Sequence, residues 1–190
     1  MLSDLVRKNR SYRRFKQDQA VSRQTLLELV DLARLSPCGR NIQALKYILI
    51  NESGQNKQVF NTLGWAAYLK DWNGPQDGEQ PAAYIIMVLD KRISPAVNCD
   101  HGIAAQSILL GAVEKGLGGC IIATIRKEQL IKYLDLDANL YEILLVLAIG
   151  SPLENVILED LAAGGDIRYW RDPDGGHHVP KRPLKDIVLK

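Results

Sequence analysis

Hydrophobic and polar positions follow one another along the chain in patterns that predict both helices and buried strands. The longest pattern is Asp100–Ile125, in which Ile103–Val113 is apolar on nearly all sides. A helix that lacks a broad polar face is normally buried on more than one side. Asp100 can cap the start of this helix, and Gly116 can end it in a left-handed conformation. We therefore predict a central helix that packs in the core and at a subunit interface.

The same periodicities predict the other elements. Leu26, Leu29 and Val30 lie on one face of an amphipathic helix, and runs rich in β-branched residues indicate strands. The predicted helices are Met1–Asn9, Thr25–Leu35, Ser53–Lys70 and Glu128–Leu134, and the predicted strands are Leu45–Ile50, Ala82–Leu89, Cys120–Ala123 and Leu144–Ile149. Asp71–Gln80 is a polar, turn-forming loop, and it is the segment that we expect to act as a mobile lid.

The order of these elements favours an α+β fold with a central sheet that helices cover on both faces. Two helices precede the first strand, and the later elements lack the regular alternation of a doubly wound fold. No G-x-G-x-x-G turn follows a predicted strand, so we do not expect a Rossmann dinucleotide site. The chain has 190 residues and no evident linker, which predicts a single domain over residues 1–190.

Composition narrows the possible partners and the compartment. The formal net charge is only +2, which gives no reason to expect nucleic acid. Cys38, Cys99 and Cys120 are odd in number and far apart, as reduced thiols of a cytoplasmic protein would be. No apolar signal-peptide segment begins the chain, and the longest apolar run, Ile143–Ile149, is too short for a bilayer. We expect a cytoplasmic protein with no membrane partner.

Basic residues gather near both ends of the chain. Arg10, Ser11 and Arg13 lie near the start, and Lys181 and Arg182 lie near the end. Guanidinium groups and a hydroxyl donor together suit a phosphate dianion. The alternative is that each cluster is simply a solvated basic face.

The sequence offers two weaker candidates for chemistry. Asp172, Asp174, His177 and His178 could suggest a metal, but adjacent histidines in a glycine-rich loop lack the usual zinc-ligand spacing. We interpret this segment as a solvated loop and predict no metal. We also find no serine, histidine and aspartate in a recognisable nucleophile motif, so no catalytic side chain is predicted.

Five short motifs, taken together and in this order, resemble the nitroreductase family over nearly the whole chain. They are Arg10-Ser11-x-Arg13-x-Phe15, Ser36-Pro37-Cys38-Gly39-Arg40-Asn41-Ile42-Gln43, Gly116-Leu117-Gly118-Gly119-Cys120, Ala148-Ile149-Gly150-Ser151-Pro152 and Lys181-Arg182-Pro183-Leu184. The resemblance implies a mostly antiparallel central sheet and an intertwined homodimer with two FMN sites at the subunit interface. It also implies hydride transfer from NAD(P)H as co-substrate to a nitro compound, a quinone or another small electron acceptor by a ping-pong scheme.

The resemblance also assigns cofactor-binding positions. It implies phosphate contacts for Arg10, Ser11, Lys181 and Arg182. Arg13 matches a position beside the pyrimidine side of the flavin. Asn41 matches a residue that contacts the ring, and Pro37, Cys38 and Gln43 belong to the same cofactor-binding loop. Ile122, Ala123 and Thr124 match the segment that lies against the isoalloxazine, where backbone N–H groups can face the ring. Because the flavin carries the chemistry, the protein's task is to position it.

Substrate binding and the exact reaction are less defined. Arg40, Trp65, Tyr68 and Trp72 are the residues that we expect to line a substrate pocket beside the ring. The tail Pro183–Leu189 is expected to leave the subunit and add a strand to the partner's sheet. Other reactions known for this fold, flavin fragmentation and reductive dehalogenation, stay open, as does a flavin-binding protein without enzymatic activity.

Overall fold

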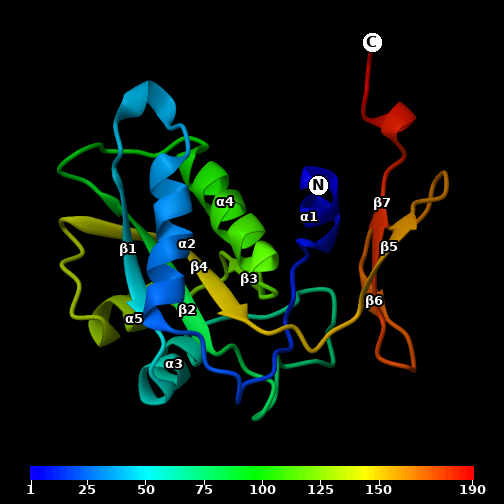
Figure 1. Cartoon of the computed structure of the whole chain (residues 1–190), viewed down its shortest axis with the longest axis horizontal. Helices are drawn as coiled ribbons and strands as arrows, with labels where there is room; N and C mark the ends of the chain where they lie inside the picture. The colour runs from blue at the N-terminus through cyan, green and yellow to red at the C-terminus, as the bar shows by residue number, and fades with distance from the viewer.

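The computed structural model describes residues 1–190 and contains two sheets. The main sheet has four antiparallel strands in the order β1-β2-β4-β3 (Figure 1). Its strands are β1 (Leu45–Ile50), β2 (Ala83–Asp90), β3 (Gly118–Ile122) and β4 (Tyr141–Gly150). The helices are α1 (Leu2–Lys8), α2 (Arg23–Leu35), α3 (Ser53–Phe60), α4 (Asp100–Glu114) and α5 (Lys127–Tyr133).

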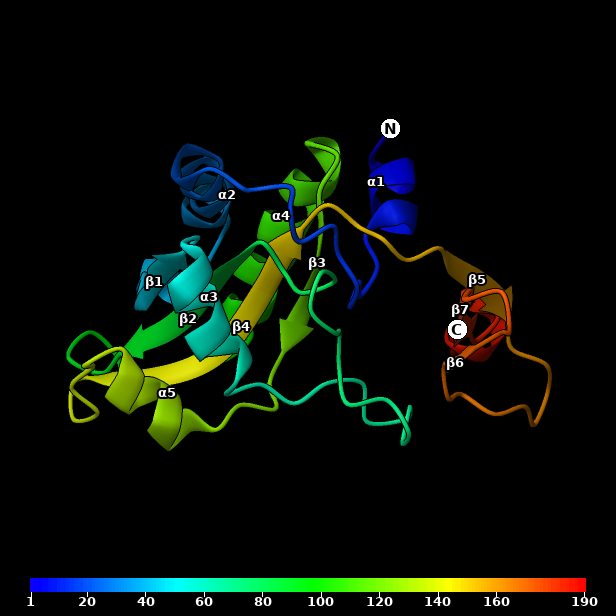
Figure 2. The same ribbon diagram turned by 90° about the horizontal axis from the view of Figure 1, so that it is seen from below.

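Helices cover both faces of the main sheet. In Figure 2, α2 and α4 lie on one side of the sheet, and α3 and α5 lie on the other. All eight residues of β2 are buried, and alternate side chains point to opposite faces. Ile85 packs in the cluster under α2 and α4, whereas Ile86 packs in the cluster that includes Val59 of α3 and Leu130 of α5. The predicted α+β fold with a covered, antiparallel central sheet is therefore confirmed.

Tyr84 places a hydroxyl group in this core without a hydrogen-bond partner, and burial raises the pKa of its phenol. Tyr84→Phe removes a polar group that is desolvated without compensation, so we expect the free energy of unfolding to rise by about 1 kcal/mol. Urea unfolding would measure this change. Tyr68→Phe at an exposed position is the control and should change stability by less than about 0.5 kcal/mol. A lower stability for Tyr84→Phe would contradict the expectation.

One predicted helix is too long. The helix expected over Ser53–Lys70 ends at Phe60, and Ala67 beyond this end is exposed. After Phe60 the chain turns toward the exit of β3, where Leu63 forms an isolated bridge with Ile125. A series of turns, with hydrogen bonds such as that from Leu69 N–H to the carbonyl oxygen of Ala66, replaces the helix that the periodicity suggested.

The predicted central helix is α4, but its first residue, Asp100, is not the N-cap that we expected. The N-cap of α4 is Cys99, not Asp100. The carboxylate of Asp100 instead accepts a hydrogen bond from the backbone N–H of Gly39 at 2.9 Å. The other end agrees with the prediction, because Gly116 adopts a φ of +74° and follows the last helical turn.

The C-terminal part forms a second sheet that the hydrophobic pattern did not predict. This C-terminal sheet has the order β5-β7-β6, and Figure 2 shows it to one side of the main sheet, beyond the N-terminal segment. Its strands are β5 (Val156–Asp160), β6 (Trp170–Arg171) and β7 (His177–Lys181).

The tail is not a strand within one chain, and its addition to a partner's sheet stays a prediction. Leu184–Asp186 forms a single 3₁₀ turn, and Leu189 is 92% exposed. Within one chain no strand pairs with this tail, so the extended form lacks the ladder partner that a strand needs. None of the helices combines the length and the apolar surface needed to cross a membrane.

Candidate functional site

The segment Asn9–Phe15 is held between β3 and the chain that leaves β4. Ser11 forms a parallel bridge with Gly119, and Phe15 forms an antiparallel bridge with Pro152. The N–H of Tyr12 donates to the carbonyl oxygen of Gly119 at 3.0 Å. Because this backbone is fixed at both ends, the side chains between Asn9 and Phe15 have defined positions.

Two glycines of β3 allow close packing around this segment. A Cβ atom at position 118 would lie 2.5 Å from the Tyr12 ring, and one at position 119 would lie 2.5 Å from the carbonyl oxygen of Ala148. Both distances are shorter than van der Waals contact, so only glycine fits here. Gly118 therefore allows the packing of the N-terminal segment on β3, and Gly119 allows the close packing of β3 against β4 and α4.

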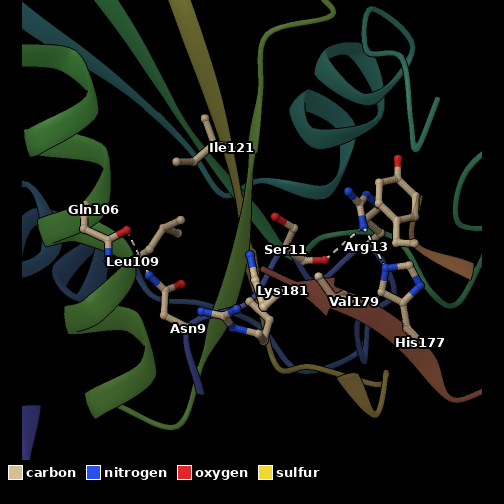
Figure 3. Close-up of a pocket in the computed structure, with 11 residues that line it drawn as sticks. Asn9, Ser11, Arg13, Gln106, Leu109, Ile121, His177, Val179 and Lys181 are labelled. Atoms are coloured by element: carbon tan, nitrogen blue, oxygen red, sulfur yellow. Dashed lines mark hydrogen bonds between the residues drawn. The ribbon is translucent and has the colours of Figure 1, made fainter. Parts of the chain in front are cut away.

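A cavity of about 300 Å³ opens beside this segment (Figure 3). Its volume is at the lower end of the range of about 300–1,000 Å³ that is usual for small-molecule sites. The walls of this basic cavity are Asn9, Arg10, Ser11 and Arg13, then Gln106 and Leu109 of α4, Ile121 of β3, and Tyr169, His177, Val179 and Lys181 of the C-terminal part. The basic residues from the two ends of the sequence thus meet at one cavity, whose walls contain no acidic side chain.

The cations of the basic cavity have no carboxylate partner. Arg10, Arg13 and Lys181 take part in none of the ion pairs of the chain. The Nη2 of Arg10 donates to the carbonyl oxygen of Val6 at 2.7 Å, while its buried Nε has no partner. Burial also lowers the pKa of Arg10. Uncompensated positive charge around a cavity is the arrangement that attracts an anion.

Arg13 is the most constrained of these side chains. Its Nη1 lies 3.2 Å from the carbonyl oxygen of Ser11 and 3.2 Å from Nε2 of His177 (Figure 3). Its guanidinium carbon lies 4.7 Å from the centre of the Tyr169 ring. Burial lowers the pKa of His177 to about 4, so this imidazole is neutral near pH 7.

Glu154 joins the N-terminal segment to the C-terminal sheet. Its carboxylate accepts the backbone N–H of Arg13 at 2.7 Å and forms an ion pair with Arg171. The side chain of Glu154 is fully buried, and that of Arg171 is 17% exposed. The guanidinium of Arg171 also stacks on Trp72, 4.2 Å from the ring centre. One buried carboxylate therefore supports both walls of the basic cavity.

The residues of the 36–43 loop that we predict to bind flavin lie away from the basic cavity within one chain. Cys38, Asn41 and Gln43 line a second cavity of about 230 Å³, which shares no residue with the basic cavity. Pro37 and Arg40 are exposed and line neither cavity. Arg40, Asn41 and Gln43 all have φ near +55°, a costly conformation for residues with a side chain and one that is frequent at functional sites.

In the segment at the end of β3, Ile121 lines the basic cavity, and the contact of Ile122, Ala123 and Thr124 with the flavin ring stays a prediction. Ile122 is buried in the core, whereas Ile121 is 41% exposed and lines the cavity. Ala123 and Thr124 are exposed and follow the strand. Arg182 is exposed and does not line the cavity, unlike its neighbour Lys181. Strand alternation is the signal that could have identified Ile121.

The predicted substrate-pocket aromatics do not share one cavity in this chain. Trp65 packs on Phe60 with ring centres 5.7 Å apart. Tyr68 packs on Tyr169 with ring centres 5.0 Å apart, and Trp72 lies under Arg171. Tyr68 and Trp72 therefore contact the C-terminal part, and a shared pocket stays a prediction.

The two adjacent histidines correct the interpretation of residues 172–178 as a solvated loop. His177 is only 1% exposed, because the alternation of β7 directs it toward Arg13 and Tyr169. His178 points to the other side, where its ring nitrogens lie against Glu159 and Asp172. These two carboxylates raise the pKa of His178. Sequence reasoning missed Tyr169, His177 and Val179 as cavity residues, since no local motif marks them.

Comparison with known proteins agrees with the fold and the motifs. The model of the nitroreductase family matches residues 6–151. A curated Bacillus subtilis (strain 168) protein, YodC, which is named as an NAD(P)H nitroreductase, is 21% identical over 173 residues that cover 75% of this chain and 86% of that protein.

Solved structures of the same fold extend over most of the chain. A nitroreductase family protein from Clostridium difficile 630 is 20% identical, covers 97% of this chain and 95% of its own, and has a TM-score of 0.68. An FMN-dependent nitroreductase from Clostridium difficile R20291 is 21% identical and has a TM-score of 0.65. The match covers 82% of this chain and 89% of that protein's chain. The family match spans more than half of the chain, so this protein belongs to the nitroreductase family.

Proposed function

We propose that the protein is an FMN-dependent oxidoreductase whose basic cavity holds the ribityl phosphate. The observation that carries this proposal is the meeting of Arg10, Arg13 and Lys181, three cations without a carboxylate partner, at one cavity. The donor set fits a phosphate dianion, because guanidinium and ammonium groups and the Ser11 hydroxyl all donate hydrogen bonds. The buried Nε of Arg10 has no partner within the chain and is a further donor for this group.

The residues of the chain would bind and orient the cofactor. Arg10, Ser11 and Lys181 would hold the phosphate, and Arg13 would place a positive charge beside the pyrimidine side of the flavin. When bound, FMN supplies hydride transfer from NAD(P)H to a small oxidised acceptor such as a nitro compound or a quinone. A cation beside the ring stabilises the negative charge of the reduced flavin. Two relatives, named as an FMN-dependent nitroreductase and an NAD(P)H nitroreductase, support this assignment.

The separation of the two cavities supports a homodimer. Asn41 and Gln43 are expected to contact the flavin ring, yet in one chain they lie in a different cavity from Arg10 and Lys181. A site that draws on both protomers would bring these two sets together. The exposed tail residues Ile187 and Leu189 are apolar, as segments that bind a partner subunit often are.

Anaerobic reduction tests the function. The purified protein, reconstituted with FMN, should be yellow, lose its absorbance in the flavin region on addition of NADH or NADPH under argon, and regain it with a quinone or a nitroaromatic compound. A protein that binds FMN but is not reduced by either nucleotide would be a flavin-binding protein without this activity. A protein that does not bind FMN at all would contradict the proposal.

A further inference from the structure

The contact between Arg13 and His177 assigns a role to a residue outside the segment that matches the family. The family match ends at residue 151, whereas His177 lies in β7, 164 positions from Arg13. The imidazole is 1% exposed and lines the basic cavity together with Arg13. Tyr169 packs on both partners: Arg13 lies over its ring, and His177 lies 5.2 Å from its centre.

The chemistry of the two groups fixes the tautomer of His177. A guanidinium group has only donors, so the hydrogen bond to Nε2 requires a lone pair on that nitrogen. The ring proton is then on Nδ1, which is buried and has no partner. His177 is therefore a neutral acceptor that keeps an unsatisfied N–H group in exchange for holding Arg13.

A neutral acceptor has a consequence that a carboxylate would not have. Glu154 lies nearby, but it accepts the backbone N–H of Arg13 rather than its guanidinium group. His177 and the carbonyl oxygen of Ser11 thus hold the Arg13 guanidinium without neutralising its charge. The full positive charge stays available to a ligand in the cavity.

We propose that His177 is a positioning residue for the flavin: it orients the Arg13 guanidinium toward the cofactor and leaves the charge of that group uncompensated. This inference rests on the proposed FMN function. A fixed cation beside the flavin should strengthen FMN binding and make the midpoint potential less negative, because it favours the reduced, more negative ring.

Two substitutions separate hydrogen bonding from packing. His177→Phe keeps an aromatic ring against Tyr169 but cannot accept from Arg13, whereas His177→Gln loses the ring but keeps an oxygen acceptor. The affinity for FMN depends on this bond only through the orientation of Arg13, so the strength of a hydrogen bond to a charged group sets the upper limit of the effect, about a ten- to hundredfold loss. We expect a loss within this limit, and a more negative midpoint potential, for His177→Phe and near wild-type values for His177→Gln. The unfolding temperature of His177→Phe should change little, since the loss of the bond to Arg13 and the removal of the unpaired Nδ1–H have opposite effects on stability.

Fluorescence titration with FMN, a redox titration and a thermal melt provide the three readouts. His178→Gln is the matched control, because it removes contacts of the same strand to Asp172 and Glu159 without touching Arg13; its FMN affinity should be that of the wild type. In an Arg13→Ala background, His177→Phe should cause no further loss of affinity.

The outcomes distinguish this inference from the function on which it rests. Wild-type affinity and potential in His177→Phe, or an equal loss in the Arg13→Ala background, would overturn the role of His177 while the FMN function stands. If His177→Phe does not fold, the FMN affinity of His177→Gln tests the inference instead. A large loss of affinity in that variant overturns the inference. If the wild type does not bind FMN, both proposals fail.

Discussion

Lys181→Glu should weaken FMN binding by about a hundredfold or more. The substitution removes a charged donor from the basic cavity and places a carboxylate where a phosphate dianion would bind. A hydrogen bond to a charged group contributes about 1.5–3 kcal/mol, repulsion adds to its loss, and each 1.4 kcal/mol corresponds to about a tenfold change in affinity. Fluorescence titration of the apoprotein with FMN would measure the change.

The control for this variant lies four positions further along the chain. Lys185 belongs to the exposed 3₁₀ turn and does not line the cavity, so Lys185→Glu makes the same change of net charge at a distance. We expect it to bind FMN with nearly wild-type affinity. Equal losses in the two variants would show a general charge effect and would contradict a specific phosphate contact.

Glu154→Ala should destabilise the protein by about 3 kcal/mol, because breaking a buried ion pair leaves an uncompensated charge. Arg171 would lose its carboxylate partner, and the backbone N–H of Arg13 would lose its acceptor. For a chain of this size the change corresponds to a fall in Tm of about 10 °C. Differential scanning calorimetry would measure it.

The matched control is an ion pair at the surface. Asp166 pairs with Arg168, and both side chains are more than half exposed, so Asp166→Ala should shift Tm only slightly. Hydrogen exchange adds a local readout. Relative to the wild type, Glu154→Ala should speed up exchange of the amides of β5 and β7 more than that of the amides of β2. Uniformly faster exchange, or a Tm equal to that of the wild type, would contradict the role of Glu154 as the link between the N-terminal segment and the C-terminal sheet.

The main sheet was largely predictable because its strands carry a local signal. β1 spans the predicted Leu45–Ile50, and β2 is apolar along almost its whole length. The C-terminal sheet lacks such a signal, since β7 reads HHVPK and β6 has two residues. These strands depend on contacts between distant segments, such as the pairing of β5 with β7, which periodicity cannot reveal.

In the candidate site too, some residues could be predicted from the sequence and others could not. The chemistry of Arg10, Ser11 and Lys181 predicts a shared anion site from residue types alone, and the structure places all three at one cavity. His177 could not be found from its neighbours in the sequence. Its role follows from the register of β7, which buries it against Arg13 and turns the adjacent His178 toward Asp172.

The most direct measurement compares the affinities of the wild-type apoprotein for FMN and riboflavin, which differ only in the phosphate. If Arg10, Ser11 and Lys181 bind that group, FMN should bind at least about a hundredfold more tightly, as the loss of charge-assisted hydrogen bonds to a phosphate implies, and the difference should shrink as salt is added. Equal affinities for the two flavins would contradict the account.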